Sequence, residues 1–72
     1  MNELLYDEHI ERTRHAIMKR IEQAREHSPS SPQHEAYLRT AGTILTGLTR
    51  NFEVADEDYD SLRRRIDAER GT

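Results

Sequence analysis

The chain has 72 residues, no cysteine and a net charge of −3, and 35% of its residues are charged. This length supports one small domain without disulfide bonds, and the interleaved signs exclude a polyanionic or polybasic tail. No apolar run approaches the ~18 residues of a membrane-spanning helix, so we expect a cytoplasmic protein with no membrane partner.

The apolar content is low for a domain that must fold alone. Only 33% of the residues are hydrophobic, against ~45–50% in an ordinary domain on a count that includes glycine. A chain this short buries only ~60% of its unfolded surface, so a single copy should be marginally stable. We therefore expect a second copy or a partner protein to complete the core.

The first predicted helix covers residues 3–27 and carries a narrow apolar stripe. The stripe has helical spacings of four, seven, four and three residues, at Tyr6, Ile10, Ile17, Ile21 and Ala24. It is about one residue wide per turn, as in a coiled-coil seam. Because the shorter helices of the same chain should not cover it fully, the stripe predicts a homodimer with the copies packed antiparallel.

Residues 28–32 read Ser-Pro-Ser-Ser-Pro and predict a bend. Each proline lacks a backbone N–H and disfavours the α conformation in the residue before it, so a helix does not continue through this segment. Apolar residues recur at helical spacing on both sides. The sequence therefore predicts a helical hairpin.

The second predicted helix covers residues 33–51 and is the most apolar part of the chain. One ridge and two flanking leucines give it a broad apolar face, made of Tyr37, Ala41, Ile44, Leu48 and Phe52 with Leu38 and Leu45. Gly42 and Gly47 lie inside this helix, where each glycine costs about 1 kcal/mol relative to alanine. Close approach of another helix is the favoured explanation, and a groove for a partner or ligand is the alternative.

The third predicted helix covers residues 57–69, with Asp56 as its expected N-cap. Acidic residues fill its first turn and arginines follow, which matches the helix dipole. Tyr59, Leu62 and Ile66 form one apolar edge. The three segments together predict an all-α fold: a hairpin plus a short third helix in a small bundle completed by dimerisation.

No pattern in the sequence indicates catalysis, a cofactor or a metal. The sequence has four histidines, and His9 and His15 lack the spacing of a helical metal site. His27 and His34 flank the bend and are expected as surface residues at helix ends. The chain has no cysteine nucleophile, no Gly-x-Ser-x-Gly elbow and no phosphate-binding glycine loop. We therefore expect a protein that is not an enzyme.

The run Arg63-Arg64-Arg65 is the sharpest polar feature of the chain. Three consecutive residues spread around a helix, and nearby acids oppose them, so a solvated, internally paired surface is favoured over a protein interface. Nucleic-acid binding needs an unopposed positive patch and is the least favoured of the three interpretations.

These observations favour a small, non-enzymatic protein-binding accessory module. We expect an inhibitor or modulator that occludes the surface of a larger protein, of the kind that phages and mobile elements encode. Aromatic and arginine side chains dominate protein interfaces, so the candidate binding residues are Tyr6, Arg50, Tyr59, Arg63 and Arg64. The alternative is a small dimeric nucleic-acid regulator that uses Arg63, Arg64 and Arg65.

Overall fold

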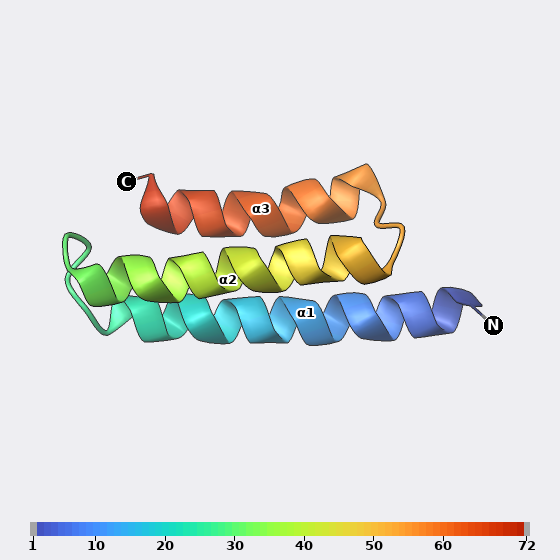
Figure 1. Cartoon of the computed structure of the whole chain (residues 1–72), viewed down its shortest axis with the longest axis horizontal. Helices are drawn as coiled ribbons and strands as arrows, with labels where there is room; N and C mark the ends of the chain where they lie inside the picture. Colours follow the sequence, from blue (N-terminus) through green and yellow to red (C-terminus); the bar gives the residue numbers. More distant parts are fainter. Residues whose placement is uncertain (1, 72) are drawn as a thin grey trace.

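The computed structural model describes residues 2–71, with side chains from Leu5 to Gly71, and this part of the chain is all-α. It contains three helices: α1 (Asn2–Arg25), α2 (Pro32–Asn51) and α3 (Asp56–Arg70). Each end lies within two residues of the predicted range. α1 and α2 form an antiparallel hairpin, and α3 runs back along α2 towards the bend (Figure 1). Within residues 2–71 no helix combines the length and apolarity needed to span a bilayer.

The bend is stabilised by a serine cap rather than by proline alone. The Ser31 hydroxyl accepts the backbone N–H of His34 at 3.2 Å and donates to the carbonyl of Ser28 at 2.7 Å. Pro32 opens α2, at a position where a backbone N–H would have no partner within the helix. The chain therefore reverses direction over a few residues and starts α2 with a satisfied N-terminus.

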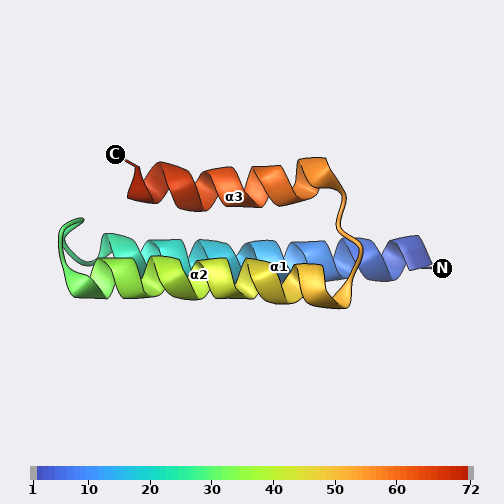
Figure 2. The same cartoon turned by 45° about the horizontal axis from the view of Figure 1, so that its top comes forward.

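One apolar core runs between the three helices. Its buried members are Ile10, Ile17, Ile21 and Ala24 of α1, Leu38, Ala41, Leu45 and Leu48 of α2, and Leu62 and Ile66 of α3. Figure 2 shows that α3 lies along one side of the hairpin formed by α1 and α2. The narrow stripe of α1 is thus covered by helices of its own chain, so the stripe no longer supports the predicted dimer.

The buried face of α2 is rotated relative to the predicted ridge. Leu38 and Leu45 lie at its centre and are almost fully buried, whereas Tyr37, Ile44 and Phe52 pack only partly against the core. The cause is that α2 contacts both α1 and α3, so the middle of its buried arc lies between the two neighbours. The predicted ridge assumed a single partner helix, which would place Tyr37 and Ile44 at the centre of the buried face.

His34 is not on the surface as predicted, because it is only 4% exposed. It lies four residues before Leu38 and therefore on the same buried ridge of α2. His34 is buried because of the rotation of α2 about its axis, which the sequence alone did not determine.

The N-terminus of α3 is capped from another helix. Ala55, not Asp56, occupies the N-cap position and offers no side-chain hydrogen bond. The Tyr6 hydroxyl of α1 instead accepts the Ala55 N–H at 3.0 Å and donates to Asp58 Oδ2 at 2.9 Å. In a capping box the side chain of the third helical residue accepts the N–H of the N-cap residue directly. Here Asp58 is that third residue, and the Tyr6 hydroxyl bridges its carboxylate and the Ala55 N–H.

Candidate functional site: a basic groove between α2 and α3

A groove of about 460 Å³ opens between α2 and α3. Its lining residues are Arg39, Gly42, Thr43, Thr46, Gly47 and Arg50 of α2 with Arg63 and Arg70 of α3. We call it the basic groove, because all of its charged lining residues are arginines. It lies on the solvent side of the two helices, away from α1.

Helical periodicity brings the four arginines together. Arg39 and Arg50 are eleven residues apart, close to three turns, so they share one side of α2. Arg63 and Arg70 are seven residues apart, close to two turns, and share one side of α3. Because α2 and α3 are neighbours in the bundle, these two sides face the same space.

The positive charge of the basic groove is only partly neutralised. Arg70 forms an ion pair with Glu35 at 3.0 Å, and Arg63 forms a longer one with Asp67 at 3.5 Å. Both pairs are exposed, so each contributes little stability and leaves other guanidinium N–H groups available. Among the described side chains, from Leu5 to Gly71, neither Arg39 nor Arg50 has an ion pair.

Gly42 and Gly47 of α2 form the floor of the basic groove, and the close approach of another helix expected there does not occur within one chain. A Cβ atom added at Gly42 or Gly47 would have no neighbour within 4 Å. No other helix of the chain therefore comes close to them. Both glycines line the basic groove, and a groove was the alternative explanation offered by the sequence.

Thr43 and Thr46 complete the floor, and their hydroxyl groups are already engaged. Thr43 donates to the carbonyl of Arg39 at 3.1 Å, and Thr46 donates to the carbonyl of Gly42 at 3.0 Å. These hydroxyl protons are used within α2, and so the cationic donors of the site come from the arginines. The floor itself is small and uncharged.

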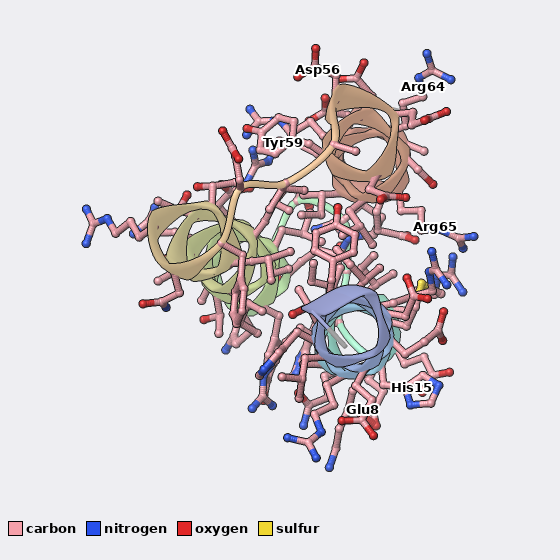
Figure 3. All side chains as sticks on the ribbon, turned by 90° about the vertical axis from the view of Figure 1, so that its right-hand side faces the viewer. Glu8, His15, Asp56, Tyr59, Arg64 and Arg65 are labelled. Atoms are coloured by element: carbon pink, nitrogen blue, oxygen red, sulfur yellow. The ribbon has the colours of Figure 1, made fainter. Side chains whose placement is uncertain are left out.

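The three consecutive arginines point in different directions. Arg63 lines the basic groove, whereas Arg65 lies on the α1 side of α3, with Nη1 3.7 Å from Met18 Sδ. Arg64 is exposed on the outer side of α3, and Figure 3 shows it well apart from Arg65. The run therefore forms no single basic face, as its helical spacing predicted.

The predicted binding residues are divided between the basic groove and other places. Arg50 and Arg63 line it, and Arg64 does not. Tyr6 is half-buried between α1 and the start of α3, where its hydroxyl has two partners. Tyr59 is partly buried against the core and comes from the side of α3 that faces α2 (Figure 3).

Sequence reasoning missed Arg39 and Arg70 as site residues. Both were visible as members of helical repeats: Arg39 pairs with Arg50, and Arg70 pairs with Arg63. The consecutive run was the more conspicuous pattern, but residues seven or eleven apart are the ones that share a helix face. That spacing is the signal that could have found the groove.

The histidines lie apart from the basic groove. His9 packs against Phe52 with ring centroids 4.3 Å apart, and His27 stacks on Tyr37 at 5.7 Å. His15 lies exposed on α1 (Figure 3). In the part of the chain that the structure describes, no group of three or more potential ligands is arranged to hold a metal ion.

Comparison of the chain with protein-family models, curated proteins and solved structures found no match. Its function is therefore inferred from its own residues. Chemically, the basic groove offers guanidinium groups around a small, uncharged floor, an arrangement suited to binding carboxylates or phosphates.

Proposed function

We propose that this protein is a small, non-enzymatic binding module that attaches to a larger protein through the basic groove. The observation that carries the proposal is that four arginines from two helices line one groove, and two of them have no ion pair with any described side chain. Arginine is enriched in the energetically dominant parts of protein interfaces. Bound in this way, the module would occlude a surface of its partner, as an accessory inhibitor does.

Nucleic-acid binding is the alternative, since guanidinium groups also bind phosphates. Three features favour a protein partner. The chain carries a net charge of −3, Glu35 and Asp67 lie beside the basic groove, and only one arginine of the consecutive run faces it. The basic strip is short, so an extended phosphate backbone would also lie near the acidic residues around it and be repelled by them.

The homodimer stays a prediction, but it requires another surface. The apolar stripe of α1 is buried within one chain, so it offers no seam to a second copy. Exposed apolar surface remains at the end of the bundle, where Leu5 is 55% exposed beside Tyr6 and Phe52. Sedimentation equilibrium tests this prediction, and a mass of one chain, 8.5 kDa, at tens of micromolar would contradict it.

Affinity capture from the cells that encode the protein tests the proposed function. The immobilised chain, the double variant Arg39→Ser/Arg50→Ser and the matched control Arg64→Ser are compared, with and without nuclease. We expect one protein to be retained by the parent chain and the control after nuclease treatment, and to be lost with the double variant.

Two outcomes would contradict the proposal. Retention of the same protein by the double variant would place its binding surface elsewhere. Loss of all capture after nuclease, together with a steep fall in binding between low and moderate salt, would make the protein a nucleic-acid binder.

A further inference from the structure

We propose that the occupant of the basic groove is an acidic α-helix of the partner protein. This inference rests on the proposed function and adds the chemistry and the shape of the bound segment. Three properties of the groove lead to it: its unneutralised charge, the spacing of its arginines and the smallness of its floor.

Charge complementarity requires an acidic occupant. Arg39 and Arg50 have no ion pair among the side chains of residues 5–71, and the partners of Arg63 and Arg70 are held in exposed, exchangeable pairs. Carboxylates accept paired hydrogen bonds from guanidinium groups in a planar arrangement. An acidic segment would satisfy Arg39 and Arg50 at once and compete with Glu35 and Asp67 for the other two.

The spacing of the arginines matches a helix laid along the groove. Arg39 and Arg50 are separated by ~16 Å along α2, and Arg63 and Arg70 by ~10 Å along α3. A helix lying parallel to both presents acids at the same axial intervals when they occur at positions i, i+4, i+7 and i+11. The occupant would then pack against α2 and α3 as a fourth helix on the outside of the bundle.

The floor permits that helix to come close. Gly42 and Gly47 leave open space where side chains would otherwise stand, and Thr43 and Thr46 are small. Helices in contact lie ~8–10 Å apart, and the shorter separation requires small residues between them. Phosphates of a nucleic acid can be reached by long arginine side chains without such a floor, so the floor favours a helix.

A second copy of this chain is a poor occupant of the same groove. Docked face to face, it would bring four more arginines against the first four, and like charges placed together oppose association. Each copy brings only two acids beside its groove, Glu35 and Asp67, against four arginines. Face-to-face docking of two grooves is therefore disfavoured, and the occupant that we propose is a different, acidic protein.

The test uses peptide probes and bulky substitutions on the floor. The probes are an alanine-rich helical peptide with glutamates at i, i+4, i+7 and i+11, the same peptide with glutamines, and a short DNA duplex. Binding to the full chain is measured by fluorescence anisotropy at moderate salt. The key variant is Gly42→Leu/Gly47→Leu, and Thr40→Leu is the control, since Thr40 is exposed on α2 outside the groove.

We expect the glutamate peptide to bind at least about tenfold more tightly than the glutamine peptide, because charged hydrogen bonds are lost in the latter. Gly42→Leu/Gly47→Leu should weaken binding by a similar factor and keep its helical circular dichroism, since both side chains enter open space. Thr40→Leu should bind as the parent chain does.

Three results would overturn the inference: equal binding of the two peptides, undiminished binding to the leucine double variant, or tighter binding of the DNA duplex. The proposed function fails separately. If the captured protein depends on Arg39 and Arg50 but tolerates both leucines, the protein-binding function stands and only the helical occupant is wrong.

Discussion

The Tyr6 hydroxyl of α1 donates a hydrogen bond of 2.9 Å to Asp58 of α3, a residue 52 positions later in the chain. The same hydroxyl accepts the N–H of Ala55, the residue at the N-cap of α3. Because Ala55 has no capping side chain, α3 depends on α1 for this role. The bridge fixes where α3 begins, and thereby where Arg63 and Arg70 meet the basic groove.

Removal of this hydroxyl should destabilise the bundle. Tyr6→Phe keeps the ring and loses both hydrogen bonds, leaving a carboxylate and an N–H without that partner. Because both groups are reachable by water, we expect a loss of about 0.5–1.5 kcal/mol in the free energy of unfolding, measured by chemical denaturation. Tyr59→Phe is the control, since no hydrogen bond holds the Tyr59 hydroxyl among the described residues, and an equal loss in both variants would contradict the role given to Tyr6.

The stability of the protein should fall at alkaline pH. Partial burial raises the pKa of Tyr6 above its ordinary value, and the hydrogen bond to Asp58 raises the pKa further, although the Ala55 N–H opposes the shift. Folding thus favours the neutral phenol, and this contribution is present below pH ~10 and is lost as the pH rises through the higher folded value. Denaturation from pH 8 upwards should show a steeper decline above pH ~10 for the parent chain than for Tyr6→Phe, and identical slopes would argue against the shift.

The glycines of the floor should weaken the fold. Gly42→Ala and Gly47→Ala each place a methyl group in open space and should raise the free energy of unfolding by up to about 1 kcal/mol. Gly71→Ala is the control, because its Cβ would lie 2.9 Å from the carbonyl oxygen of Asp67 and no gain is expected. Thermal melts that fall for the α2 variants would show that another surface contacts these glycines.

The centre of the core should be intolerant of truncation. Leu45 is almost fully buried in the common core, so Leu45→Ala should cost about 2–5 kcal/mol and largely unfold a domain of this size. Leu5→Ala, at the exposed end of α1, should change the melting temperature little. Parent-like circular dichroism and melting of Leu45→Ala would mean that the buried face of α2 is misplaced.

Periodicity and proline chemistry were sufficient to predict the helices. The stripe from Ile10 to Ala24 and the Ser-Pro bend before α2 are local patterns, and the structure contains both, whereas the Ser31 cap was not predicted. The phase of α2 was less accessible, because its apolar arc is broad and its centre depends on where two other helices lie. Leu38 and His34 lie on the buried face of α2, where Tyr37 and Ile44 were predicted to lie.

The candidate site was accessible only in part for a related reason. Spacing places Arg39 with Arg50 and Arg63 with Arg70, but it does not show that α3 packs on the side of α2 that joins the two pairs. The position of α3 also determines what surrounds Gly42 and Gly47. From sequence alone, both glycines are equally compatible with a packed neighbouring helix and with open space. The Tyr6 bridge is a contact between distant segments that no local pattern encodes.

Mapping the bound acidic peptide by nuclear magnetic resonance tests the central claim most directly. Backbone amide shifts of the full, labelled chain are followed as the glutamate peptide is added. The account predicts that the perturbed amides concentrate on the two walls of the basic groove, around Gly42 to Arg50 of α2 and Arg63 to Arg70 of α3. Perturbations centred instead on the outer face of α1, or on the exposed end around Leu5 and Phe52, would contradict it.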